Sequence, residues 1–190
     1  MEHDVAVTHG AFWYLRHGET DWNRQGLSQG SIDIPLNATG LAQARDAAER
    51  LQGRGIGSIV ASPLARARVT AEIVAEVLGL PVTIDPDLRE VGWGVHEGQP
   101  LAEWFHEWID GRVTPEGAES FTALRQRVVA GLNRAMGLSP AVLIVAHGGV
   151  FRAIRSAMKV ETTIRTRNCV PIWCEPPGAA ASDWSLAFHD

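Results

Sequence analysis

Short apolar runs alternate along the chain with longer stretches in which apolar and charged residues recur at helical spacing. The runs have the length of buried strands and lie at residues 11–15, 58–61, 82–84 and 141–146. The amphipathic stretches predict helices at residues 39–53, 62–78, 101–110, 118–136 and 150–158. Two further runs that are expected to close the sheet lie at residues 170–174 and 184–188. The alternation predicts an α/β protein, a three-layer α/β/α sandwich with a mostly parallel sheet.

The expected elements fit one domain over residues 1–190, because no repeat, low-complexity stretch or linker divides the chain. The helices expected between residues 99 and 137 follow a glycine-rich loop, and we expect them to form a small helical cap. Thr39 is the expected cap of the first helix. Ser62-Pro63 is a start signal for the second helix and puts Arg66 in its first turn.

Composition and charge narrow the classes of function. Hydrophobic residues make up 45% and charged residues 21%, as in soluble globular proteins. The net charge of -5 gives no overall basic field, so we expect neither nucleic acid nor a membrane surface as a partner. No apolar run approaches the roughly 20 residues that span a bilayer, and the N-terminus lacks a signal-peptide pattern, so we expect a cytoplasmic protein.

Cysteine and histidine spacing argues against a disulfide and against a metal centre. Cys169 and Cys174 stand at an odd offset that sends their side chains to opposite faces of an extended segment. The seven histidines show no ligand spacing, so no metal and no cofactor is expected. A monomer and a homodimer both stay open, because residues 170–174 form a candidate edge strand that Pro171 weakens.

Two histidine-containing motifs follow predicted strands. His17 stands in Arg16-His17-Gly18 after the run at 11–15, and His147 begins His147-Gly148-Gly149 after the run at 141–146. Ligands of open α/β sheets bind beyond the carboxyl ends of strands, so the two histidines can meet in one crevice. Arg16 and Arg66 add planar guanidinium groups that match phosphate oxygens. This set suits phosphoryl transfer without a metal, and the flanking cations favour the neutral form of His17.

In this order along the chain, five motifs resemble the histidine phosphatase superfamily, the phosphoglycerate mutase-like family. The motifs are Leu15-Arg16-His17-Gly18-Glu19-Thr20 with Asn23, Gln29-Gly30 with Pro35-Leu36-Asn37 and Gly40, Ser62-Pro63-Leu64-Ala65-Arg66-Ala67 with Thr70-Ala71, Leu88-Arg89-Glu90 with Gly94 and Glu97-Gly98, and His147-Gly148-Gly149. The resemblance implies a phosphoglycerate mutase-like fold.

The same resemblance implies a role for each matching residue. It makes His17 the phosphorylated nucleophile, Glu90 the proton donor, and Arg16, Arg66 and His147 the ligands of the phosphoryl group. It adds a phosphate or substrate lining from Asn23, Gln29, Trp93 and the backbone of Gly30 and Gly148. Glu19 is expected to make only a structural bond in its loop. A phosphate dianion beside Glu90 favours its protonated form, as proton donation to a leaving oxygen requires.

These residues predict a metal-independent phosphomonoester hydrolase that acts on a small-molecule phosphate ester through phosphohistidine. The family's mutases hold a second acidic group with paired arginines in a longer insertion, whereas residues 100–119 contain only Arg112 against five carboxylates. A phosphoglycerate mutase-type transferase is therefore the alternative, and a catalytically silent phosphoanion-binding module is another. Trp104, Phe105 and Trp108 either form a partly apolar wall for an uncharged or ring-bearing leaving group or anchor the cap.

Overall fold

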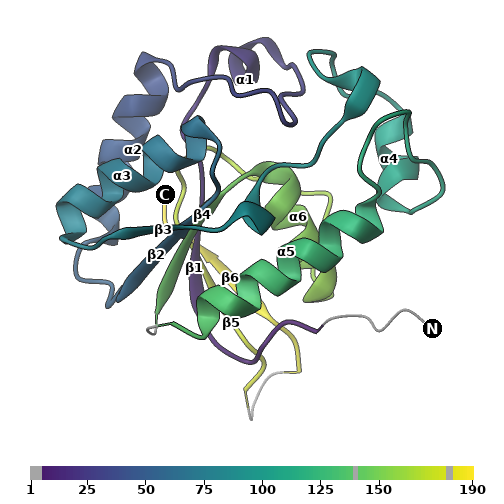
Figure 1. The fold of residues 1–190 in the computed structure, drawn as a ribbon. Coiled ribbons are helices and arrows are strands. Elements are labelled where there is room, and N and C mark those ends of the chain that lie inside the picture. The colour runs from purple at the N-terminus through teal and green to yellow at the C-terminus, as the bar shows by residue number, and fades with distance from the viewer. Residues whose placement is uncertain (1–5, 139–140, 179–181) are drawn as a thin grey trace.

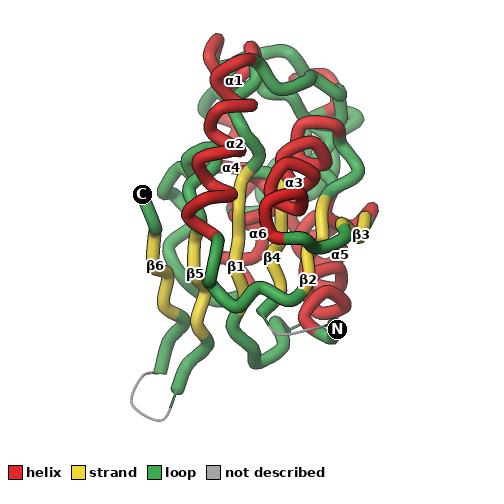
Figure 2. The backbone as a smooth tube through the Cα atoms, turned by 90° about the vertical axis from the view of Figure 1, so that its left-hand side faces the viewer, coloured by secondary structure: helices red, strands yellow, loops and turns green. Residues whose placement is uncertain are grey.

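The computed structural model describes residues 6–138, 141–178 and 182–190. In this part of the chain six strands form one sheet in the order β3-β2-β4-β1-β5-β6. The strands are β1 (Phe12–Arg16), β2 (Ser58–Ala61), β3 (Val82–Ile84), β4 (Val142–Ala146), β5 (Ile172–Glu175) and β6 (Ser185–Phe188). Strands β3, β2, β4 and β1 are parallel, and β5 and β6 join antiparallel (Figure 2). The prediction of a mostly parallel sheet is confirmed.

Helices cover both faces of this sheet. They are α1 (Asp21–Gln25), α2 (Ala38–Leu51), α3 (Ala65–Leu78), α4 (Trp104–Ile109), α5 (Phe121–Met136) and α6 (Gly148–Ala157). Figure 1 shows α2 and α3 on one face and α5 and α6 on the other. Alternate residues of β1 serve the two sides, because Phe12 and Tyr14 pack in the core under α5 and α6 while Trp13 and Leu15 pack under α2 and α3. The three-layer sandwich is confirmed.

The starts of two helices differ in detail from the predictions. Asn37, not Thr39, caps α2, and its side chain accepts a hydrogen bond from the Gly40 amide at 2.8 Å. Helix α3 begins at Ala65 without a side-chain cap. Ser62 is not its N-cap residue: the Ser62 hydroxyl accepts from the Leu64 amide at 3.3 Å and lies 2.7 Å from Nε2 of His147. Arg66 nevertheless stands in the first turn, as predicted.

The cap expected over residues 99–137 covers a shorter segment in the structure. Helix α5 lies in the body beside α6, and its Leu124, Val128 and Leu132 are fully buried in the core. Its apolar face is large, and burial of that face keeps the helix packed against the sheet. Only α4 and the loops around it extend beyond the body. Trp108 anchors this segment, because its side chain is fully buried and its indole N–H donates to the Glu119 carbonyl at 2.8 Å.

The structure contradicts the candidate edge strand at residues 170–174. Strand β5 is no edge strand, because it lies between β1 and β6. Pro171 just precedes it and so removes no hydrogen bond from its pairing with β1. Strand β4 lies between β2 and β1. The segment with Arg66, which follows β2, is therefore separated from the end of β1 by the end of β4, where His147 stands.

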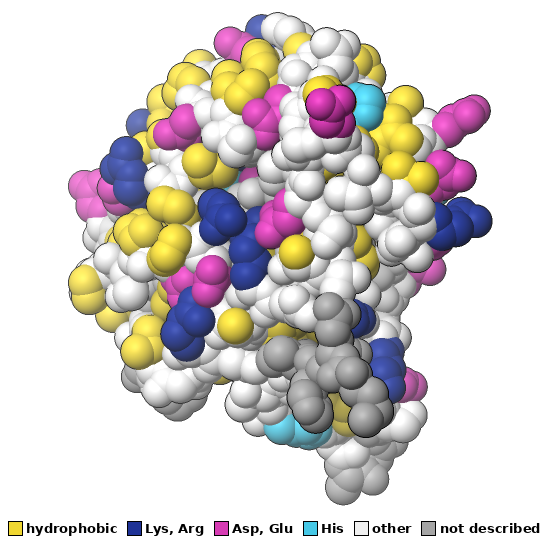
Figure 3. Space-filling view, turned by 45° about the vertical axis from the view of Figure 1, so that its right-hand side comes forward, with side chains coloured by type: hydrophobic (Ala, Val, Ile, Leu, Met, Phe, Trp, Pro, Cys, Tyr) yellow, Lys and Arg dark blue, Asp and Glu magenta, His cyan; other side chains and the backbone are white. Residues whose placement is uncertain are grey.

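The surface and the buried thiols complete the picture. Figure 3 shows basic and acidic side chains interspersed on one face of the molecule. Cys169 and Cys174 are both buried and unpaired. Within residues 6–138, 141–178 and 182–190, no helix is long and apolar enough to cross a membrane. Over the same residues, no cluster of three or more His, Cys, Asp or Glu side chains is placed to hold a metal ion.

Candidate active site

A cavity of about 380 Å³ opens beyond the carboxyl ends of β1 and β4. This volume suits a small organic ligand. All the predicted site residues except His147 line it, namely Arg16, His17, Asn23, Gln29, Gly30, Arg66, Glu90, Trp93 and Gly148. His147 is fully buried beside His17, with the two ring centroids 5.2 Å apart. The fold therefore brings the whole predicted set together.

His17 is held in one ring orientation. It directly follows β1, and its amide donates to the Ala146 carbonyl of β4 at 3.0 Å. Its Nδ1 lies 2.7 Å from the Gly18 carbonyl. Because a carbonyl oxygen only accepts, Nδ1 carries the hydrogen, and Nε2 of the neutral ring keeps its lone pair. Burial lowers the pKa of His17 well below its ordinary value, and Arg16 and Arg66 lower this pKa further.

The loop after His17 passes the start of α2 at very short range. A Cβ on Gly18 would lie 2.4 Å from the Gly40 carbonyl oxygen, so a side chain is excluded there. The Gly18 amide donates to Oγ1 of Thr70 on α3 at 3.1 Å. Glu19 accepts a hydrogen bond from the Asn37 side chain at 2.9 Å, so its predicted structural bond is confirmed. These contacts fix the backbone that carries His17.

Two buried arginines are oriented by backbone carbonyls. Arg66 donates to the carbonyls of Ile32 and Gly30, both at 2.8 Å. Arg16 donates from one end of its guanidinium to the Thr166 carbonyl at 2.7 Å. The Nε–H groups of both arginines have no partner among the described residues. Since carbonyls hold each guanidinium without neutralising it, both keep their positive charge and spare donors for an anion in the cavity.

His147 lies beside the Ser62 hydroxyl and the ring of His17. Its Nε2 lies 2.7 Å from Oγ of Ser62, and the Tyr14 hydroxyl donates to its carbonyl at 2.6 Å. Its Nδ1 is buried and has no partner in the described part of the chain. Burial lowers the pKa of His147 well below the ordinary value, and Arg66, His17 and Arg16 lower this pKa further. The ring is therefore neutral and has one nitrogen to spare.

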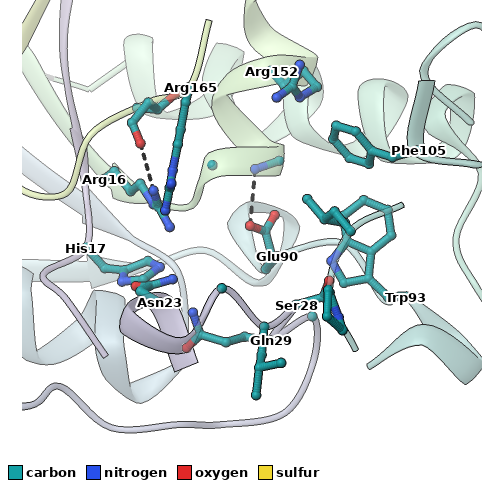
Figure 4. A pocket seen from close by; sticks show the side chains of 18 of the residues that line it. Arg16, His17, Asn23, Ser28, Gln29, Glu90, Trp93, Phe105, Arg152 and Arg165 are labelled. Carbon is teal, nitrogen blue, oxygen red and sulfur yellow. Dashed lines mark hydrogen bonds between the residues drawn. The ribbon is translucent and has the colours of Figure 1, made fainter. Parts of the chain in front are cut away.

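Glu90 enters the cavity from the loop after β3. One carboxyl oxygen accepts from the Val91 amide at 3.0 Å and the other from the Gly149 amide at 3.1 Å. Figure 4 shows the second bond, which ties the carboxyl to the first turn of α6. A Cβ on Gly149 would lie 2.5 Å from a Glu90 oxygen, so a side chain there would displace the Glu90 carboxyl. Gly149 stood in the predicted motif, but its contact with Glu90 had no signal in the sequence.

Two amide side chains present their nitrogen to the cavity. Oδ1 of Asn23 accepts from the Thr20 amide at 3.3 Å and from the Asn168 side chain at 3.2 Å. Oε1 of Gln29 accepts from the Thr20 hydroxyl at 2.9 Å. Because internal donors occupy the oxygens, the NH₂ groups are left for an acceptor in the cavity. Asn168 also donates to the His17 carbonyl at 2.8 Å and was not predicted.

The wall opposite His17 is partly apolar, as one of the two interpretations predicted. Trp93 and Phe105 line the cavity together with Leu101. Trp104 and Trp108 do not line it. Trp104 stacks on His96 with ring centroids 4.4 Å apart, and Trp108 is buried. The two tryptophans therefore have the anchoring role, and Phe105 has the lining role.

The sequence led us to expect no paired cations beside the phosphoryl site, and this expectation was wrong. Arg152 of α6 and Arg165 of the loop after α6 both line the cavity. Figure 4 shows Arg165 extending toward Arg16, and Arg152 beside Phe105. That expectation rested on residues 100–119, and these two arginines come from elsewhere in the chain. Ser28 is another unpredicted lining residue.

A neutral buried histidine, two fixed guanidinium groups and a positioned carboxyl at the strand ends of an α/β sandwich define a phosphoanion site of the phosphoryl-transfer type. The model of the histidine phosphatase superfamily (branch 1) matches residues 12–169. The chain belongs to this superfamily.

Curated relatives and solved structures agree with the family. The chain is 44% identical over 142 residues to the uncharacterized phosphatase PhoE of Bacillus subtilis, covering 74% of this chain and 72% of that protein. It is 35% identical over 174 residues to the probable phosphoglycerate mutase GpmB of Yersinia pestis, covering 83% and 80%. A mycobacterial glucosyl-3-phosphoglycerate phosphatase, solved with VO3, superposes with a TM-score of 0.79 at 30% identity, covering 93% of this chain and 97% of that one.

Proposed function

We propose that the protein hydrolyses a phosphomonoester of a small organic alcohol, without a metal ion, through a phosphohistidine on His17. The observation that carries this proposal is the state of His17. Its ring is neutral, its Nδ1 hydrogen is bound to the Gly18 carbonyl, and its Nε2 is left as a nucleophile beside Arg16 and Arg66. The phosphatases among the relatives support hydrolysis.

In the first step, Nε2 of His17 attacks phosphorus and the bond from phosphorus to the ester oxygen breaks. The leaving oxygen takes the proton of Glu90, whose carboxyl is held by the Val91 and Gly149 amides. Arg16 and Arg66 stabilise the charge on the equatorial phosphoryl oxygens. If Ser62 donates to Nε2 of His147, the Nδ1–H of His147 becomes a third donor to these oxygens.

In the second step, water attacks the phosphorus of phosphohistidine and gives a proton to Glu90. The bond from phosphorus to nitrogen breaks, phosphate leaves, and His17 regains its neutral ring. Glu90 thus acts first as an acid and then as a base, so both steps use the same carboxyl in the same place. No metal is needed, because the guanidinium groups supply the positive charge.

The test is to trap the intermediate. After rapid quenching of a reaction with p-nitrophenyl phosphate, intact-mass spectrometry should detect one added phosphoryl group that acid removes and base does not. His17→Ala should abolish both this adduct and turnover, and a chelator should change neither in the native protein. Turnover that survives His17→Ala, or that a chelator removes, refutes the proposal.

A second candidate is mutase-type transfer, which the additional arginines Arg152 and Arg165 favour because a mutase must hold a second acidic group. In that reaction phosphohistidine passes its phosphoryl group to a second alcohol instead of water. With 3-phosphoglycerate and a bisphosphate primer, we expect release of phosphate and negligible 2-phosphoglycerate. Interconversion faster than phosphate release makes the mutase the better description.

A further inference from the structure

The loop that follows α6 is held rigidly above the cavity by three arginines. Arg16 donates to the Thr166 carbonyl at 2.7 Å, and Arg155 donates to the Ile164 carbonyl at 2.7 Å. Arg152 donates to the Thr162 carbonyl, and its guanidinium stacks on the Phe105 ring at 4.9 Å from the centroid. The loop is therefore a built part of the site and positions whatever side chain it presents.

The side chain that this loop presents to the cavity is Arg165. It lines the cavity from a solvent-exposed position, and its guanidinium makes no hydrogen bond or ion pair to another described residue. Its charge lies close enough to lower the pKa of Arg16, after the larger effect of burial. Two neighbouring guanidinium groups repel each other unless an anion lies between or beside them. This arrangement favours a ligand with negative charge at Arg165.

Among the described residues that line the cavity, cationic side chains outnumber carboxylates. Four guanidinium groups line it, from Arg16, Arg66, Arg152 and Arg165, and Glu90 is the only carboxylate in the lining. Both histidines are neutral because their pKa values are lowered. Carboxylates outside the lining act on two of these cations, Asp33 and Glu97 on Arg66 and Glu161 on Arg152. Arg165 pairs with no carboxylate among the described residues, so it is the cation left for a second anionic group.

We propose that Arg165 and Arg152 form a second oxyanion subsite, which recognises a carboxylate or a second phosphate on the alcohol part of the substrate. This inference rests on the proposed function, since it assigns a substrate class to the same cavity. The apolar wall of Trp93 and Phe105 covers the carbon skeleton between the two anionic groups. Arginine suits such a subsite because its planar fork matches two oxygens at once.

The first test measures binding and needs no turnover. Three phosphonates differ in the group at the end of the chain away from the phosphonate. Propylphosphonate has no second anionic group, 3-phosphonopropionate has a carboxylate, and propane-1,3-bisphosphonate has a second phosphonate. Calorimetry should show the two doubly anionic ligands binding on the order of 10- to 100-fold more tightly than propylphosphonate, as a charge-assisted hydrogen-bond pair predicts. Arg165→Gln should remove most of this preference and leave propylphosphonate binding nearly unchanged.

A matched control lies two residues away. Arg167 has the same charge, but it pairs with Asp190 at 3.0 and 2.9 Å and does not line the cavity. Arg167→Gln should therefore keep the preference. Because Arg152 also holds the loop, Arg152→Gln should weaken the preference and should loosen the loop as well. Circular dichroism melts of all three variants show whether they are folded.

The second test uses turnover. Hydrolysis of 3-phosphoglycerate is compared with that of glycerol 3-phosphate, which has a hydroxymethyl group in place of the carboxylate. We expect Arg165→Gln to raise KM for the acid alone, with kcat little changed. Equal losses for both substrates assign Arg165 to the phosphoryl group and overturn the proposal, as does a native protein that binds all three phosphonates equally. If the ligands show the preference but no ester is hydrolysed, the proposed function fails and the subsite stands.

Discussion

Replacing Gly149 by alanine tests the role of Glu90 without a substitution of Glu90 itself. The new Cβ would lie 2.5 Å from one Glu90 oxygen and 3.1 Å from Cγ1 of Val91, whereas ordinary contacts begin at 3.4 Å. The Glu90 side chain must then move, and the 3.1 Å hydrogen bond from the Gly149 amide is strained or lost. A proton donor displaced by about 1 Å costs on the order of 10²-fold in rate.

The loss should depend on the leaving group. An alkyl alkoxide needs the proton of Glu90 in the transition state, whereas p-nitrophenolate leaves readily without it. We therefore expect kcat/KM of Gly149→Ala to fall about 10²-fold for an alkyl phosphate such as glycerol 3-phosphate and much less for p-nitrophenyl phosphate. Steady-state kinetics with both esters measure the difference.

Gly92 provides the control, since it stands in the same loop as Glu90 and a Cβ there meets nothing within 4 Å. Gly92→Ala should have native kinetics with both esters. Equal losses for the two esters in Gly149→Ala point to damage at the phosphoryl site, and unchanged rates show that Glu90 needs no fixed position. Either result removes the argument that Gly149 holds a proton donor.

Three further outcomes follow from the same geometry. The acid limb of kcat/KM should lie well below pH 6.5, because burial and then Arg16 and Arg66 lower the pKa of His17; Arg66→Gln should shift that limb upward in a pH–rate profile, and a stationary limb contradicts the cause. Thermal stability should fall as the pH drops below 6.5, because His17 binds a proton there in the unfolded chain but stays neutral in the folded protein. Fluorimetric melts should show a weaker dependence of Tm on pH in His17→Asn. Gly40→Ala should lower Tm, because its Cβ would lie 2.1 Å from the backbone oxygen of Glu19, and a native Tm refutes this.

The strands and the residues at their ends were predictable because both signals are local. The runs at 11–15 and 141–146 are apolar throughout, as strands buried on both faces require, and a histidine stands within two residues of the end of each run. The register of β1 with β4, in which Arg16 pairs with Ala146, then brings His17 and His147 together. The sequence alone could not show that β4 lies between β1 and β2, because strand order depends on packing of the whole sheet.

Helix α5 was misplaced for a related reason. Its amphipathic pattern predicts one buried face but does not name the surface that buries it. The neighbouring α4 does leave the body, and the two helices were grouped because they are close in sequence. Both helices contact the same core: Leu124 and Leu132 of α5 are fully buried in it, whereas α4 buries Trp108 there and its Trp104 packs against the core and stacks on His96.

The additional arginines show why a search by sequence position can misjudge specificity. A second anionic group was sought where the family's mutases hold theirs, and the single Arg112 of that segment is exposed and paired with Asp110 at 2.8 Å. Arg152 and Arg165 become neighbours of the site only because α6 starts at His147 and its following loop returns over the cavity, held at the Thr166 carbonyl by Arg16. Arg16, which we propose binds the phosphoryl group, thus also positions the loop that carries Arg165. We therefore expect a substitution of Arg16 to alter phosphoryl transfer and substrate selection together. Arg165→Gln separates the two, because it removes the charge and leaves every carbonyl bond of the loop in place.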